Sequence, residues 1–153
     1  MTTLEAIYNY RRLSPRLATA GQPLEEELHA IGRSGFEVVI NLGLADAPYA
    51  VADERAILES HGLRYLHIPV SFEAPEAGRF ESFREHMRAL AQRRLFVHCA
   101  ANKRVSVFVA LYRVIEEGRR LDEVWTDVEA IWQPDAAWQA FIRDTLRAAG
   151  SAG

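Results

Sequence analysis

Leu95-Phe-Val-His-Cys-Ala-Ala-Asn-Lys-Arg-Val-Ser106 is the stretch that decides how this chain folds, because it passes from a strand into a helix within a few residues. Leu95 to His98 is a short apolar run typical of a buried strand, and apolar residues recur at helical spacing from Val105 to Glu117. A buried strand that leads directly into a helix is the repeating unit of a parallel α/β sheet.

The rest of the chain alternates in the same way. Three more strands are predicted, at 16–20 on an edge, 36–42 and 63–70. Helices are predicted at 24–33, 51–60, 80–94, 121–132 and 135–148, and the tail 149–153 is expected to fray. This order predicts a single α/β domain over residues 1–153, with a mostly parallel central sheet of four to five strands and helices on both faces.

Composition excludes several classes of protein. The net charge of −3 gives no general attraction for nucleic acid or for an anionic membrane, and no apolar stretch approaches the ~18 residues of a membrane span. The N-terminal residues do not resemble a signal peptide, so the protein is expected in the cytoplasm. One cysteine excludes an internal disulfide, and the five histidines lack tight metal-ligand spacing; we expect neither a metal nor a cofactor.

The loop after the strand is suited to binding an anion at the carboxyl end of the sheet, where ligands bind in such folds. Ala100 and Ala101 let the backbone approach a ligand closely, and Asn102 accepts a left-handed conformation cheaply. A tight turn there would aim successive N–H groups, including that of Val105, at one point. The helix N-terminus adds to this field.

Two cations stand beside these amides. Arg104 could hold two oxygens of a tetrahedral anion through its planar fork, and Lys103 adds a charge, although it could equally be an ordinary surface residue. The same field favours the thiolate of Cys99, which makes Cys99 the expected nucleophile. A buried structural cysteine is the competing interpretation. His98 is expected to support the loop and not to bind a metal.

The segment Val97–Ser106 resembles the signature of cysteine-dependent protein tyrosine and dual-specificity phosphatases. More closely, the chain resembles a bacterial branch of small dual-specificity-phosphatase-like proteins, sometimes fused to metallo-β-lactamase-fold hydrolases. The likeness covers nearly the whole chain and extends to Arg16–Pro23, Val39–Leu42, His67–Val70 and Ile131–Pro134. The resemblance implies a protein tyrosine phosphatase-like fold and hydrolysis of a phosphate monoester through a phosphocysteine intermediate.

The loop departs from most of that superfamily in length. Four residues separate Cys99 from Arg104, where most cysteine phosphatases have five. Sulfurtransferases of the rhodanese type also use the shorter loop. An alternative activity is therefore sulfur transfer through a Cys99 persulfide, and a non-catalytic module that binds a phosphorylated ligand is a third interpretation.

The general acid is the other departure. The branch often has Asp after Ile-Pro-Val, but this chain has Ser71, and Glu73 follows two residues later. Glu73 is the expected acid, with Asp46 and Asp53 as competitors; each could instead be a solvated loop carboxylate. Ser106 could donate a hydrogen bond to the leaving thiolate, or it could satisfy the backbone of the first helical turn.

Together these features predict a protein phosphatase or related phosphoric monoester hydrolase whose catalytic residues are Cys99, Arg104, Ser106 and Glu73. Its substrate-binding residues are predicted to be Ala100, Ala101, Asn102, Lys103 and Val105. The expected partner is a phosphorylated protein, carrying phosphotyrosine or phosphoserine, or a small phosphate ester. Trp125, Trp132 and Trp138 are expected in the core.

Overall fold

A five-stranded sheet in the order β1-β2-β5-β3-β4 forms the centre of the computed structural model, which describes residues 3–152. The strands are β1 (Arg11–Ser14), β2 (Leu17–Ala20), β3 (Val38–Asn41), β4 (Arg64–His67) and β5 (Leu95–His98). β5 pairs in parallel with β2 and β3, and β1 is antiparallel to β2 at one edge. The predicted mostly parallel α/β sheet is confirmed.

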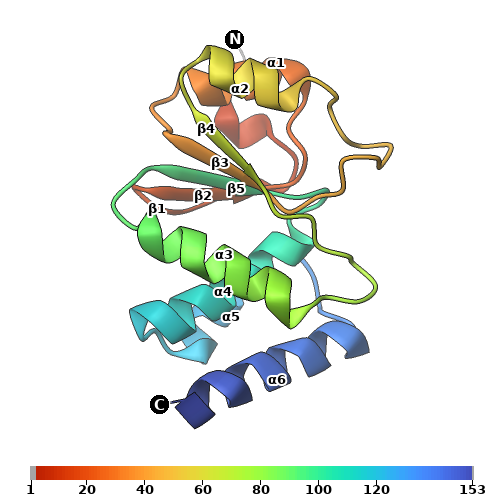
Figure 1. Cartoon of the computed structure of the whole chain (residues 1–153), viewed down its shortest axis with the longest axis vertical. Helices are drawn as coiled ribbons and strands as arrows, with labels where there is room; N and C mark the ends of the chain where they lie inside the picture. The colour runs from red at the N-terminus through yellow and green to blue at the C-terminus, as the bar shows by residue number, and fades with distance from the viewer. Residues whose placement is uncertain (1–2, 153) are drawn as a thin grey trace.

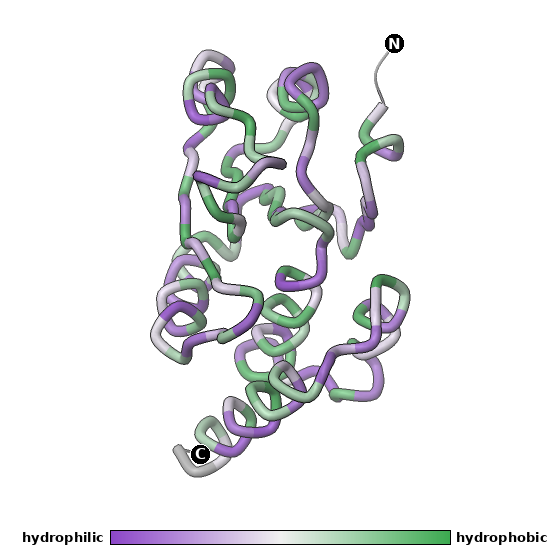
Figure 2. Tube along the Cα trace, turned by 90° about the vertical axis from the view of Figure 1, so that its right-hand side faces the viewer, coloured by the Kyte–Doolittle hydropathy of each residue, from purple (hydrophilic) through white to green (hydrophobic). Residues whose placement is uncertain are grey.

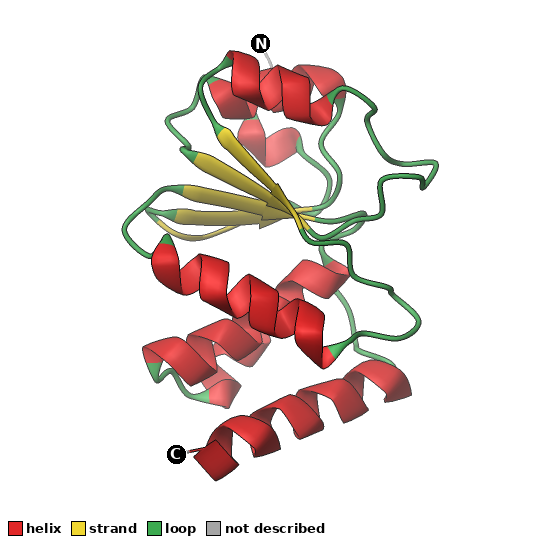
Figure 3. Cartoon of the chain, viewed as in Figure 1, coloured by secondary structure: helices red, strands yellow, loops and turns green. Residues whose placement is uncertain are grey.

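Helices cover both faces of this sheet (Figure 1). On one face lie α1 (Glu25–Gly32) and α2 (Glu54–Ser60), with the short 3₁₀ helix η1 (Leu4–Ala6) nearby. The other face carries α3 (Ala77–Ala89), α4 (Lys103–Glu117), α5 (Leu121–Glu129) and α6 (Ala136–Ala152). Figure 3 shows the resulting helix–sheet–helix layers and the loops that gather at one end of the strands.

The central strands are buried on both sides, which explains their continuous apolar runs. Along β5, Leu95 and Val97 face the core beneath α3 to α6, whereas Phe96 faces the core beneath α1 and α2. Figure 2 shows hydrophobic and hydrophilic residues alternating along the helical turns, as expected of helices that pack one face inward. Trp138 is fully buried, and Trp125 and Trp132 pack half-buried against the same core as predicted.

One strand was missed, and two predictions at the ends of elements were wrong. The strand β1 was not predicted, because Arg11-Arg12-Leu13-Ser14 has no apolar pattern and is held by backbone pairing at an edge. Helix α4 begins at Lys103 and not near Val105. The tail predicted to fray is helical through Ala152, where it continues α6; Gly153 lies outside the described residues.

Within residues 3–152 no helix is both long enough and apolar enough to cross a bilayer.

Candidate active site

The predicted loop lies at the carboxyl end of β5 and leads into α4, where parallel strands place ligands in folds of this kind. Asn102 has φ 66° and ψ 4°, so its predicted left-handed conformation is confirmed. The loop is pinned to the turn after β2, because the N–H of Gln22 donates to the carbonyl of Ala100 at 2.9 Å. The chain thus turns sharply within a single residue before the helix begins.

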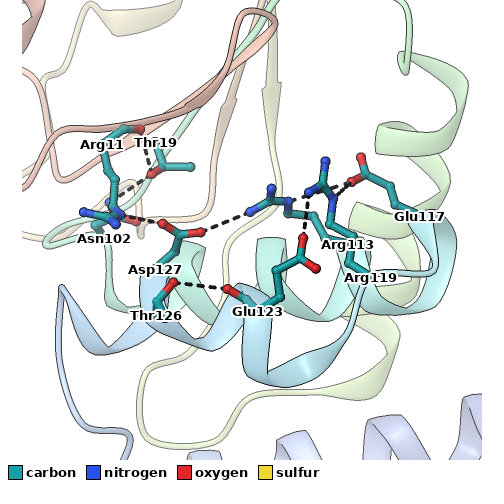
Figure 4. Close-up of polar contacts among 9 residues, drawn as sticks. All are labelled: Arg11, Thr19, Asn102, Arg113, Glu117, Arg119, Glu123, Thr126 and Asp127. Atoms are coloured by element: carbon teal, nitrogen blue, oxygen red, sulfur yellow. Dashed lines mark hydrogen bonds and ion pairs between the residues drawn. The ribbon is translucent and has the colours of Figure 1, made fainter.

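Asn102 is also the anchor between this loop and the N-terminal segment. Its side-chain amide donates to the carbonyl of Asn9 at 2.9 Å and to the hydroxyl of Thr19 at 3.1 Å. In return, the Asn9 amide donates to the carbonyl of Ala101 at 3.0 Å. Figure 4 shows Thr19 between Asn102 and Arg11. The curvature of the loop therefore depends on residues about ninety positions earlier in the chain.

Replacing Asn102 tests this anchor. Asn102→Ala should lower the free energy of unfolding by about 2–4 kcal/mol, because it removes two buried hydrogen bonds and forces a β-carbon into the left-handed region. Asn102→Gly loses the same bonds but adopts this conformation freely, so its loss should be smaller by about 1 kcal/mol. Urea unfolding measures both values. Equal losses would mean that the backbone conformation contributes nothing.

The Cys99 side chain lies beneath the loop and is fully buried. It joins the apolar core that includes Val97 and Val105, and its own N–H donates to the carbonyl of Ala20 at 3.4 Å. The thiol is therefore shielded from bulk solvent at the base of the turn.

Several N–H groups above Cys99 have no protein acceptor. The N–H groups of Lys103, Arg104 and Val105 lie in the first turn of α4 and have no acceptor within the helix. The first hydrogen bond of the helix runs from the N–H of Ser106 to the carbonyl of Asn102. Among the described residues, the N–H groups of Ala100 and Ala101 also donate to no protein group. Unpaired donors on such a turn, at a helix N-terminus, are suited to an oxyanion.

Arg104 is almost completely buried and joins three loops. Its Nη1 donates to the carbonyl of Val70 at 2.7 Å, and its Nη2 donates to the hydroxyl of Tyr49 at 3.3 Å. The same hydroxyl accepts the N–H of Leu44 at 2.9 Å. A guanidinium has five donor hydrogens, so three remain for a ligand after these two bonds. The positive charge is thus held in the first turn of α4, directly after the loop.

Lys103 and Ser106 both have neighbours in an aromatic cluster. The Lys103 ammonium lies 5.8 Å from the ring centre of Phe72 and 5.6 Å from that of Trp132, close enough for cation–π attraction. The Ser106 hydroxyl donates to the carbonyl of Lys103 at 2.8 Å and accepts the indole N–H of Trp132 at 3.1 Å. The Ser106 hydroxyl must give up its hydrogen bond to the Lys103 carbonyl before it can donate to the Cys99 sulfur.

The predicted acids lie on exposed loops. Asp46, Asp53 and Glu73 are all exposed, and Glu73 forms no hydrogen bond or ion pair with any residue in 3–152. Glu73 borders a groove of about 660 Å³ between α3 and α6, and no residue from Cys99 to Val105 lines this groove. The structure therefore brings Cys99 and Arg104 into one site but shows no contact between Glu73 and the loop.

Sequence reasoning missed a buried carboxylate below this site. Glu54, at the start of α2, is 3% exposed, and its Oε2 lies 2.5 Å from Nε2 of His98. Burial opposes ionisation, but the charge and hydrogen bond of His98 and the hydrogen bond of Gln22 lower the pKa of Glu54 below its ordinary value. The pair therefore stabilises the fold above the ordinary glutamate pKa, and this contribution is lost as the pH falls through the lowered pKa.

No signal in the sequence marks Glu54. It is one of several carboxylates near a predicted helix start, and only the packing of α2 against β5 shows that it faces His98.

Comparison with known proteins gives a family match over most of the chain. A family model described as PTP-NADK, a DSP-PTPase phosphatase fused to NAD+ kinase, matches residues 7–143. The chain is 29% identical over 115 residues to the beta-lactamase hydrolase-like protein of Xylella fastidiosa, covering 73% of this chain. It spans only 26% of the length of that curated relative.

Solved structures share the architecture. A DUF442 protein from Shewanella putrefaciens CN-32 superposes with a TM-score of 0.85 at 27% identity, covering 95% of each chain. TpbA of P. aeruginosa, solved in complex with pTyr, has a TM-score of 0.72 at 21% identity, covering 95% of this chain and 91% of the other. At that identity the second likeness concerns the fold alone.

Proposed function

The chain belongs to the DSP-PTPase phosphatase family, and from this premise we propose that it hydrolyses phosphate monoesters through a phosphocysteine intermediate. The observation that carries the proposal is the loop itself. Cys99 lies at its base, five unpaired N–H groups lie along it, and the buried guanidinium of Arg104 follows at the start of α4. Transfer of a phosphoryl group needs chiefly positioning and charge stabilisation, which such a loop supplies.

The first step forms a bond between Cys99 sulfur and phosphorus and breaks the bond from phosphorus to the ester oxygen. Arg104 and the loop amides of Ala100, Ala101, Lys103 and Val105 would hold the three equatorial oxygens while this happens. Asn102 would act mainly through the turn that its backbone makes. The leaving oxygen takes a proton from a general acid, for which Glu73 is our candidate.

In the second step water attacks phosphorus, the bond from phosphorus to sulfur breaks, and inorganic phosphate leaves. The Ser106 hydroxyl, turned away from the Lys103 carbonyl, would donate to the departing thiolate. A phosphorylated protein or a small phosphate ester would serve as substrate. The solved complex of a fold neighbour with pTyr makes phosphotyrosine the first ester to try.

Sulfur transfer is the second candidate, and the length of the loop favours it. With four residues between Cys99 and Arg104, the loop offers fewer amides than one with five, and a persulfide sulfur needs only a small electropositive pocket. The family match over residues 7–143 favours phosphate.

Two assays on the unmodified protein separate these functions. We expect release of p-nitrophenol and phosphate from p-nitrophenyl phosphate, and no thiocyanate from thiosulfate and cyanide. Thiocyanate formation without phosphate release would replace our proposal by sulfur transfer. Binding of phosphate or phosphotyrosine with neither reaction would identify a binding module.

Glu73→Gln tests the acid. If Glu73 protonates the leaving oxygen, turnover of an alkyl phosphate should fall by about 10²-fold, because an alkoxide is a poor leaving group. Hydrolysis of p-nitrophenyl phosphate should hardly change, because p-nitrophenolate needs little protonation. Glu76→Gln, an exposed neighbour next to α3, is the matched control. Equal effects on both substrates would remove Glu73 from this role.

A further inference from the structure

The side-chain oxygen of Asn102 has no hydrogen-bond partner, although this side chain is 0% exposed. In the part of the chain that the structure describes, it is the one buried side-chain nitrogen or oxygen in this condition. The amide nitrogen of the same side chain is fully used, since its two hydrogens go to the carbonyl of Asn9 and the hydroxyl of Thr19. Buried polar atoms are almost always paired with protein or with ordered water, so this oxygen requires a donor.

The two ends of the amide are not interchangeable. The carbonyl of Asn9 can only accept, so the atom of Asn102 that faces it at 2.9 Å must be the nitrogen. The oxygen is therefore the atom of this amide that is left without a partner.

Asn102 borders a small cavity on the side of α4 that faces β1, β2 and α5. The volume of this cavity is about 10 Å³, the space for roughly one water molecule. Thr19 contributes a hydroxyl to its wall. The remaining polar wall is an ion-pair cluster, in which Arg11 and Arg113 bind the two oxygens of Asp127 at 2.8 and 3.1 Å. Polar cavities hold water, whereas apolar cavities stay dry.

The charges around the cavity decide which ligand fits. The guanidinium groups of Arg11 and Arg113 oppose a cation. The carboxylate of Asp127 and the side-chain oxygen of Asn102 are both acceptors and oppose an anion. An uncharged molecule that donates and accepts at once suits both kinds of wall, and in this volume that molecule is water.

We propose that the cavity binds one water molecule, which donates to Oδ1 of Asn102 and accepts a hydrogen bond from the guanidinium of Arg11. Arg11 is the arginine already joined to this side chain, because its carbonyl accepts from the Thr19 hydroxyl that binds the Asn102 amide. Figure 4 shows Asn102 and Arg11 on the same side of Asp127. Within residues 3–152, Arg11 donates to Asp127 only through Nε, so its terminal nitrogens are left for the water.

This water adds a second support to the active-site loop. The amide nitrogen of Asn102 ties the left-handed turn to the N-terminal segment. Through the water and Arg11, the oxygen of the same side chain is tied to Asp127 on α5. The site is independent of whether the loop acts on phosphate or on sulfur, so it can be tested without any measurement of activity.

A high-resolution crystal structure of the unmodified protein tests the site directly. We expect one well-ordered water at hydrogen-bond distance, about 2.6–3.2 Å, from both Oδ1 of Asn102 and a terminal nitrogen of Arg11. A cavity without water density, or a guanidinium bonded directly to Oδ1, would overturn the proposal. This measurement needs no variant, so it decides even where a variant does not fold.

NMR of the assigned side-chain amides tests the same site in solution. The water should give NOE cross peaks to the amide protons of Asn102, with the sign of a long-lived complex. Thr19→Val should keep these peaks, which excludes the Thr19 hydroxyl as their source. Arg11→Leu should lose them, because the group that holds the water is gone. Arg12→Leu is the matched control and should keep them, since Arg12 is exposed on the same strand and does not line the cavity.

The contrary outcomes are equally definite. Cross peaks that vanish in Thr19→Val would belong to that hydroxyl and not to a bound water. Cross peaks that persist in Arg11→Leu would remove Arg11 as the donor, and their loss in Arg12→Leu would mean that any change in β1 disturbs them. Each of these results would overturn the proposal.

Discussion

Cys99→Ser is expected to lower hydrolysis of p-nitrophenyl phosphate by at least about 10³-fold while phosphate or vanadate still binds. A serine hydroxyl at this position has no adjacent base and stays protonated at neutral pH, whereas a thiolate attacks phosphorus directly. The loop amides and the guanidinium of Arg104 are untouched, so the oxyanion site remains. Steady-state kinetics and isothermal titration with phosphate measure the two quantities.

Because Cys99 is fully buried against apolar residues, Cys99→Ala is the control for folding. Alanine places no polar group among these apolar residues, whereas serine buries a hydroxyl there. The alanine variant should therefore be at least as stable as the serine variant and equally inactive. Retained hydrolysis in both variants would contradict a phosphocysteine intermediate. Loss of phosphate binding in both, with folding intact, would mean that the sulfur is part of the anion site.

Arg104→Lys is expected to have the next largest effect, a loss of about 10²-fold in affinity for phosphate or tungstate. A lysine ammonium is a point charge and cannot hold two oxygens in a plane, nor can it keep both the Val70 carbonyl and the Tyr49 hydroxyl as partners. Titration calorimetry measures the affinity, and kcat/KM for p-nitrophenyl phosphate should fall in parallel.

Arg113→Lys is the matched control, because Arg113 is another buried arginine on α4, and its partner is Asp127, which also binds Arg11 (Figure 4). It should lower stability without changing affinity for the anion. Tyr49→Phe removes only one partner of Arg104 and should have a small effect. An unchanged tungstate affinity in Arg104→Lys would mean that the guanidinium does not face the ligand.

The sequence was most informative where local preference and tertiary environment agree. The strand β5 and its loop were predictable, because a buried parallel strand needs a continuous apolar run and the turn needs a residue that tolerates a positive φ. The edge strand β1 was not, since its polar side chains carry no periodic signal and its pairing depends on β2. The start of α4 at Lys103 follows from Asn102 and was placed two residues too late.

Site residues that act through distant contacts could not be found in this way. Arg104 was identified from its spacing to Cys99, but its bonds to Val70 and Tyr49 join loops 34 and 55 residues away. Glu54 meets His98 across 44 residues, and nothing local to either indicates the pairing. Glu73 was chosen for its place after Val70, and whether it reaches a substrate remains a prediction for the kinetics of its variant.

The reciprocal bonds between Asn9 and the Cys99 loop bear on how the protein acquires its site. They join residues 92 and 93 positions apart, and β5 is inserted between β2 and β3, so the loop closes only when both ends of this long segment have met. Closures of that kind are slow steps in folding. During synthesis, the turn around Cys99 therefore has no supporting contacts until β2, which is made early, pairs with β5, which is made much later. The loop around Cys99 is thus assembled together with the fold as a whole and not before it.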